Sequence, residues 1–140
     1  MFELFDHTAD LGLRVRAGTL EELFAESGRG LCQMIVLNLQ DVQPREEHPV
    51  ELESDQLEFL LFDWLDELLY AFESKRLLLA HFEVQVQQRE NSFHLQATCR
   101  GEVADPRRHQ LDHEVKAITY HGLRVQQTPE GYLAEVIVDI

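Results

Sequence analysis

The feature that most constrains the fold of this chain is a broad apolar stripe on one predicted helix between residues 57 and 72. Leucine and aromatic residues recur there at the three- and four-residue spacing of a helix face: Leu57, Leu60, Leu61, Trp64, Leu65, Leu68, Leu69 and Phe72. The acidic residues of the segment lie mainly off that stripe. A helix with so wide an apolar face is buried by other elements, so we expect it in the core of a folded domain.

The C-terminal half of the chain supplies strands for that helix to cover. Four segments alternate apolar and polar residues with period two, the pattern of a strand with one buried face: residues 81–87, 93–103, 113–127 and 132–140. Shorter strands are predicted at residues 2–5, 11–17 and 49–54, with a polar loop from Gln40 to Pro49. Turns are predicted at residues 91–92 and 129–131, where small and turn-forming residues gather.

A second helix is predicted from Thr19 to Ile35. Thr19 and Glu22 have the spacing of a capping box, and Gly28 and Gly30 inside the helix indicate a close approach of a neighbouring element. Asp55 and Glu58 have a similar spacing at the start of the Leu-rich helix. Two main helices and about seven strands predict one α+β domain over residues 1–140, with the helices packed on a largely antiparallel or mixed β-sheet.

The charge of the chain excludes one class of partner. It carries 26 acidic and 12 basic residues, a formal charge of −14, and its densest basic spot is the pair Arg107–Arg108. Direct binding to nucleic acid needs clustered lysine and arginine, so it is not expected. Residues 1–75 hold 17 of the acids and only 5 of the bases. This acidic half favours a basic protein or a metal cation as partner, unless its charge serves solubility alone.

The two cysteines and the hydropathy of the chain indicate where in the cell the protein is expected. Cys32 and Cys99 stand alone in a predicted helix and a predicted strand, which fits neither a zinc finger nor a disulfide framework. No signal peptide is recognisable, and no apolar run approaches the ~18 residues of a membrane span. We therefore expect a reduced, cytoplasmic location and no membrane partner.

Acidic residues at two strand ends form the first candidate site. Asp10 opens one predicted strand, and Asp139 closes the last strand beside Ile140, whose α-carboxylate is a third potential ligand. If the two strands are neighbours, the three carboxylates converge, and oxygen ligands of this kind suit Ca²⁺, Mg²⁺ or Mn²⁺. The alternative is that these carboxylates are simply solvated.

Histidines and nucleophiles give weaker signals. His109, His113 and His121 lie within 13 residues, which resembles a zinc site only if the segment is helical, and surface histidines are the alternative. Lys116 and His121 lie an odd number of residues apart along a predicted strand, so they are expected on opposite faces. We find no nucleophile elbow and no phosphate-binding loop, so an independent enzyme is not expected.

Several segments, in order along the whole chain, resemble the archease family. They are the opening stretch "FDHTADLGL" (residues 5–13), "TLEELF" (19–24), "LFDWLDELLYAFE" (61–73), "DPRRH" (105–109), "KAITYHGL" (116–123) and the terminal "VIVDI" (136–140). Each is weak alone, but their order and the family length make the combination specific.

The resemblance implies a function. Archeases are small α+β proteins that act on the RtcB-type RNA-splicing ligase, which joins 3′-phosphate or 2′,3′-cyclic phosphate RNA ends to 5′-hydroxyl ends. They promote guanylylation of the ligase and its multiple turnover in tRNA splicing and RNA repair. We therefore expect an activator of that ligase, with no catalytic residues of its own and no direct contact with nucleic acid.

The resemblance also implies a divalent-metal site, calcium first, with manganese or magnesium as alternatives. Its ligands are Asp10, Asp139 and Ile140, and Asp6 ranks below them because this position varies between acids in the family. His7 and Thr8 are expected to order the turn around Asp10. Together with Lys116 and His121, these two residues are also candidates for a partner surface.

Two other functions are compatible with the sequence. An ATP-independent chaperone or protein-modulating module would expose an apolar patch and protect unrelated proteins. A metal-dependent hydrolase using Asp10 and Asp139 would turn over substrate alone and lose activity on chelation.

Overall fold

The computed structural model describes residues 1–7 and 10–140, with the side chains of Asp6 and His7 outside that description. In this part of the chain, two α-helices, one short 3-10 helix and eight strands follow one another. They are β1 (Phe2–His7), β2 (Asp10–Ala17), α1 (Leu20–Ile35), η1 (Leu39–Asp41), β3 (Glu46–Ser54), α2 (Leu57–Lys75), β4 (Leu77–Arg89), β5 (Ser92–Val103), β6 (Ala117–Ile118), β7 (Arg124–Thr128) and β8 (Gly131–Asp139).

The strands form two sheets, and every strand pair in them is antiparallel. One sheet has the order β1–β2–β8, and both β6 and β7 pair with the other edge of β8. The second sheet has three strands in the order β3–β5–β4. The α+β class predicted from the sequence is confirmed, although the strands form two sheets where one was expected.

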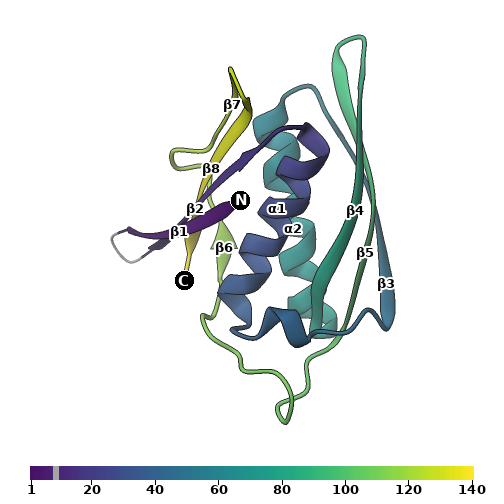
Figure 1. Ribbon diagram of the computed structural model, residues 1–140, viewed down its shortest axis with the longest axis vertical. Helices are drawn as coiled ribbons and strands as arrows, with labels where there is room; N and C mark the ends of the chain where they lie inside the picture. The colour runs from purple at the N-terminus through teal and green to yellow at the C-terminus, as the bar shows by residue number, and fades with distance from the viewer. Residues whose placement is uncertain (8–9) are drawn as a thin grey trace.

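The two helices lie between the two sheets. Figure 1 shows α1 and α2 side by side, with the five-stranded sheet on one flank and the three-stranded sheet on the other. Each sheet therefore turns one face to the helices and leaves the other face open to solvent. Strand alternation explains this arrangement, because β2 and β4 each place a buried apolar face toward the helices.

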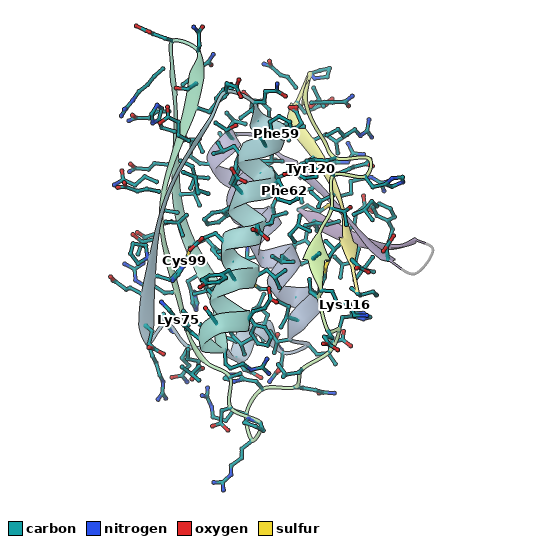
Figure 2. All side chains as sticks on the ribbon, turned by 180° about the vertical axis from the view of Figure 1, so that it is seen from behind. Phe59, Phe62, Lys75, Cys99, Lys116 and Tyr120 are labelled. Carbon is teal, nitrogen blue, oxygen red and sulfur yellow. The ribbon has the colours of Figure 1, made fainter. Side chains whose placement is uncertain are left out.

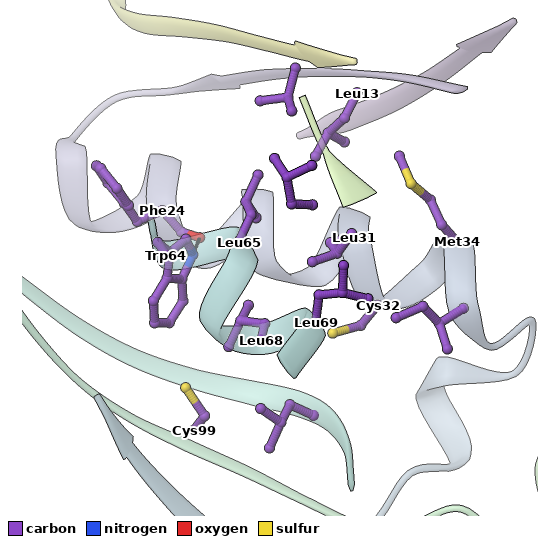
Figure 3. Close-up of a cluster of buried hydrophobic side chains, with 14 of the residues drawn as sticks. Leu13, Phe24, Leu31, Cys32, Met34, Trp64, Leu65, Leu68, Leu69 and Cys99 are labelled. Atoms are coloured by element: carbon purple, nitrogen blue, oxygen red, sulfur yellow. Dashed lines mark hydrogen bonds between the residues drawn. The ribbon is translucent and has the colours of Figure 1, made fainter. Parts of the chain in front are cut away.

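One apolar core joins the three layers, as the close-up in Figure 3 shows. The predicted stripe of α2 lies in it, with Trp64 and Leu65 fully buried. The indole N–H of Trp64 donates a 2.8 Å hydrogen bond to the carbonyl of Phe24 in α1, so its polar group is satisfied inside the core. Both cysteines lie in or beside this core, and burial raises the pKa of the Cys32 thiol to about 12, which leaves it unreactive.

The start of α1 confirms the predicted cap. The hydroxyl oxygen of Thr19 accepts a 3.1 Å hydrogen bond from the Glu22 N–H, and the Glu22 carboxylate accepts from the N–H of Gly18. The predicted close approach at the glycines is also confirmed. Gly30 lies directly against the Leu13 side chain, and a Cβ added at Gly28 would lie 3.1 Å from Leu68.

One strand prediction is wrong. Residues 113–127 were expected to form one strand, but only β6 and β7 are extended, and a turn separates them. The turn needs the left-handed backbone of Gly122 (φ +65°), and the Leu123 N–H closes it on the Tyr120 carbonyl. Lys116 and His121 lie outside both strands, so strand alternation does not relate their side chains, and the predicted placement on opposite faces of one strand is wrong.

Two smaller predictions also change. The expected loop from Gln40 to Pro49 ends earlier, because β3 begins at Glu46 and includes Pro49. Proline is tolerated there because β3 is an edge strand of its sheet. The expected acidic start of α2 at Asp55 is wrong: the N-cap residue is Gln56, which makes no side-chain capping hydrogen bond.

Candidate functional site

The candidate site lies where β2 begins and β8 ends. Asp10 is the first residue of β2, Asp139 is the last residue of β8, and the two are directly opposite in the antiparallel register. Directly opposed residues of an antiparallel pair project to the same face, with Cβ atoms about 4.5–5.5 Å apart. The two strands are therefore neighbours, which is the condition for bringing these carboxylates together.

Strand alternation decides which face the two aspartates occupy. Leu11 and Leu13 of β2 are buried in the core opposite Val138 and Val136 of β8. Because successive side chains alternate between faces, Asp10 and Asp139 project from the opposite face, away from the helices. The pair therefore sits on the outer face of the five-stranded sheet, at its tip, and both residues are half-buried.

A neutralised row of charges crosses the same outer face four residues further along the strands. Arg14 donates to Glu135 at 3.0 Å, and Arg124 donates to the same carboxylate at 2.6 Å. The Arg124 hydrogen bond, followed by that of Arg14, lowers the pKa of Glu135 against the opposing effect of burial. Four residues of strand span about 14 Å, so these arginines do not reach the aspartate pair.

Between the charged row and the tip lies an apolar spacer. The ring of Phe5 in β1 covers Gly12 of β2, where any side chain would collide with it. The guanidinium of Arg14 lies 4.7 Å from the centre of that ring. Gly12 is paired with Ile137, which is buried although it belongs to the outer-face row. This spacer keeps the cations of the charged row apart from Asp10 and Asp139.

The carboxylate oxygens at the tip are the kind of ligand that a hard divalent cation prefers. Within residues 1–7 and 10–140, no lysine, arginine or histidine forms an ion pair with the Asp139 carboxylate. Two opposed carboxylates offer only oxygen ligands, which Ca²⁺, Mg²⁺ and Mn²⁺ accept. The described residues contain no group of three or more acidic, histidine or cysteine side chains placed to hold a metal, so a metal role for Asp10, Asp139 and Ile140 stays a prediction.

Of the remaining predicted residues, Lys116 and Ile140 lie beside Asp139, and His121 lies in the turn between β6 and β7. The Lys116 N–H donates to the Asp139 carbonyl at 2.8 Å, and Lys116 has an exposed side chain. The exposed His121 follows Thr119, whose hydroxyl donates to the Ile137 carbonyl and accepts from the His121 N–H. Ile140 is half-buried and packs against the core.

Part of the predicted corner lies outside the described residues. The backbone of His7 pairs with Asp10 at the tip, on the side of β2 away from β8. The side chains of Asp6 and His7, and the whole of Thr8, are not among the residues that the structure describes. Their expected roles stay predictions.

A second carboxylate site, at the end of β5, was not predicted. The Glu102 side chain is only 7% exposed, and both its oxygens accept hydrogen bonds from Arg108. The Gln43 N–H donates to it at 2.7 Å, and His109 contacts it at 3.2 Å. The pKa of Glu102 is lowered to about 2, and the hydrogen bonds from Arg108 have the largest effect. The hydrogen bonds from Gln43 and His109 also lower this pKa, whereas burial raises it.

His109 has a defined proton position in this second site. Its Nδ1 accepts a 2.9 Å hydrogen bond from the Asp105 N–H, so Nε2 carries the proton that is donated to Glu102. His109 is therefore buried and structural, and the alternative of a surface histidine is wrong for it. His113 is exposed, with Asp112 at 3.7 Å. The three histidines do not form a metal site within the described part of the chain.

Comparison with known proteins identifies the family. The sequence matches the model of the Archease protein family (MTH1598/TM1083) over residues 2–140. The chain belongs to the archease family. It is 38% identical to protein archease of Thermococcus kodakarensis and 36% identical to that of Pyrococcus furiosus, in each case over 99% of this chain and 98% of the relative.

Solved structures of the family have the same fold. The solution structure of Methanobacterium thermoautotrophicum protein 1598 superposes with a TM-score of 0.88 at 33% identity, covering 99% of this chain and 98% of that one. The crystal structure of an archease from Thermotoga maritima, described as a possible chaperone, gives a TM-score of 0.60 at 18% identity. At that identity the second likeness supports the fold alone. In the described part of this chain, no helix has the length and hydropathy needed to cross a membrane.

Proposed function

We propose that this chain activates an RtcB-type RNA-splicing ligase, promoting guanylylation and multiple turnover of the ligase in tRNA splicing and RNA repair. The observation that carries the proposal is the register of Asp10 opposite Asp139 at an outer sheet tip, in a chain of the archease family. The −14 charge supports a basic protein partner rather than direct contact with RNA.

Asp10 and Asp139 would hold a divalent cation at this tip, with the Ile140 carboxylate as a third ligand. Like charges placed directly opposite on two strands destabilise the pair, and a cation between them removes that penalty. A bound Ca²⁺, Mn²⁺ or Mg²⁺ supplies positive charge that can bind phosphate oxygens. The Lys116 and Thr119 backbone contacts fix the last residues of β8, which keeps Asp139 in position.

The test is ligation of a 3′-phosphate RNA by limiting cognate ligase, with GTP and Mn²⁺. We expect addition of this protein to convert the ligase from single to multiple turnover. Asp10→Asn and Asp139→Asn remove one charge each and should reduce stimulation at least tenfold while leaving the melting temperature near that of the wild type. Asp55→Asn is the matched control, because Asp55 is exposed and lies outside the tip.

Each outcome separates this proposal from its alternatives. Loss of stimulation in the tip variants and not in Asp55→Asn would support an activator that acts through the two carboxylates. Absence of stimulation by the folded wild type would contradict the proposal. Substrate turnover by this protein alone, abolished by chelation, would instead indicate the metal-dependent hydrolase.

A chaperone is the second candidate function, and exposed aromatic residues favour it. Phe59 and Tyr120 are both exposed and in contact with each other. A chaperone would suppress aggregation of unrelated proteins at stoichiometric amounts, with no need for Asp10 or Asp139. Light scattering of two unrelated unfolding proteins, with and without this chain, tests that function directly.

A further inference from the structure

The outward face of α2 carries both aromatic and acidic residues. Five side chains at helical spacing are exposed along it: Phe59, Asp63, Asp66, Tyr70 and Glu73. Phe59 is 44% exposed and Tyr70 is 62% exposed, which is unusual for large apolar rings in a helix whose other face fills the core. We call these five residues the α2 face, and they lie outside the carboxylate tip of β2 and β8.

Tyr120 extends the α2 face with a fixed ring. It stacks on Phe62 at 4.0 Å with an interplanar angle of 7°, and it meets Phe59 edge-on at 6.1 Å. Figure 2, which views the molecule from behind, shows Tyr120 beside Phe59 and Phe62 where the β6–β7 turn meets α2. Tyr120 is nevertheless 61% exposed. A ring that is both exposed and held in place loses little freedom on binding, so it suits an anchor for a partner.

The α2 face carries acidic residues, among them Asp63 and Asp66. In the described part of the chain, no lysine or arginine forms an ion pair with Asp63 or Asp66. Partial burial, and then the charge of Asp66, raise the pKa of Asp63. By contrast, Arg100 pairs with Glu47 and Glu83 on the outer face of the three-stranded sheet.

These features select one kind of occupant. Arginine can lay its planar guanidinium on an aromatic ring and donate to a carboxylate at the same time, whereas lysine is a compact charge with weaker stacking. Aromatic residues and acids recur along α2 about one turn apart, roughly 5–6 Å. We propose that the α2 face, together with Phe62 and Tyr120, is a docking surface for an arginine-bearing segment of a partner protein.

The proposal does not depend on the identity of that partner, so a synthetic probe tests it. The probe is a nine-residue peptide of alternating glycine and arginine, compared with its lysine counterpart of equal charge. Amide chemical shifts of this protein are followed during titration. We expect shifts centred on residues 59–73 and 118–123, and binding of the arginine peptide at least threefold tighter than that of the lysine peptide.

Variants distinguish this surface from general acidity. The double variant Phe59→Ala with Tyr120→Ala should weaken the arginine peptide about tenfold, and Phe59→Leu with Tyr120→Leu should weaken it similarly, because leucine keeps the apolar volume but lacks the ring. Both side chains are exposed, so the core remains intact, and an unchanged amide spectrum outside the α2 face checks this.

A charge-matched pair completes the test. Asp63→Asn with Asp66→Asn should weaken the peptide, whereas Glu46→Gln with Glu51→Gln on β3 removes the same charge from another exposed surface and should leave binding nearly unchanged. Shifts spread over all acidic surfaces, equal affinity for the two peptides, or an equal effect of the two charge-matched variants would each overturn the proposal.

Discussion

Two carboxylate sites, both at strand ends, show different ways of managing negative charge. At the end of β5, Glu102 is buried and receives hydrogen bonds from Arg108, His109 and the Gln43 backbone. At the tip of β2 and β8, Asp10 and Asp139 face each other on the outer sheet face, about 14 Å along the strand from the row of Arg14, Glu135 and Arg124. The first site buries one carboxylate among hydrogen-bond donors, and the second places two carboxylates opposite each other.

This difference separates the structural role of Glu102 from the functional role that we propose for Asp10 and Asp139. The Glu102 network ties the segment around Arg108 and His109 to the sheet and to Gln43, so it stabilises the chain reversal after β5. The aspartate pair lies on the outer face at the sheet tip, where two like charges directly opposite each other are unfavourable. A cation bound between the two carboxylates would lower that repulsion.

The largest expected effect on stability comes from removing the Glu102 carboxylate. Glu102→Ala should lower the free energy of unfolding by about 2–3 kcal/mol, because it leaves the buried N–H of His109 and the partly buried Arg108 guanidinium without their acceptor. Urea unfolding measures the change. Asp139→Ala, the matched variant at the tip, should not lower it, because it removes one of two like charges that face each other. Equal losses in the two variants would contradict the distinction between the sites.

The pH dependence of stability sharpens the same comparison. The folded pKa of Glu102 is about 2, below its ordinary value of 4.5. Its ionised form therefore stabilises the fold fully above about pH 4.5, and this contribution is lost as the pH falls from 4.5 toward 2. Unfolding of the wild type should become easier across this window, and Glu102→Gln should flatten the dependence. An unchanged slope in the variant would show that other carboxylates dominate acid unfolding.

The sequence predicts most of the fold because its periodicities are local. The stripe of α2, the Thr19 cap and the alternation of β2 and β8 each depend on residues within one element, and each is found in the structure. The division into two sheets was not predictable in this way, since it depends on which strands pair across long stretches of chain. The break between β6 and β7 depends on one residue, Gly122, whose turn interrupts an otherwise continuous alternation.

The two carboxylate sites also differ in how far the sequence predicts them. The sequence named Asp10 and Asp139 as candidates, and the structure shows them opposite each other in paired strands, while their role in metal binding stays a prediction. The Glu102 network was missed because Gln43 is 59 residues away and His109 lies in an irregular segment with no pattern. The aromatic cluster did leave a signal, since Phe59 and Phe62 are large apolar residues that fall outside the predicted stripe of α2.

The next effect in size is cation binding at the tip. A ligand that binds only the folded state stabilises it by mass action, about 1.4 kcal/mol at a concentration tenfold above its dissociation constant. Millimolar Ca²⁺ or Mn²⁺ should therefore raise the melting temperature of the wild type by about 5 °C relative to chelator. Asp10→Asn and Asp139→Asn should abolish this shift, and Glu102→Gln should keep it. No shift in the wild type with Ca²⁺, Mg²⁺ or Mn²⁺ would count against a metal at the tip.

The smallest effect isolates the repulsion between the two aspartates. In chelator, Asp139→Asn should stabilise the fold by about 0.2–1 kcal/mol, because it removes one of two like charges placed opposite each other. The gain should shrink in 1 M NaCl, where the screening length falls to about 3 Å. Asp55→Asn, which removes an isolated exposed charge, should show no comparable gain. A destabilising effect of Asp139→Asn in chelator would mean that the Asp139 carboxylate is already balanced within the chain, as Glu102 is, and the contrast between the two sites would disappear.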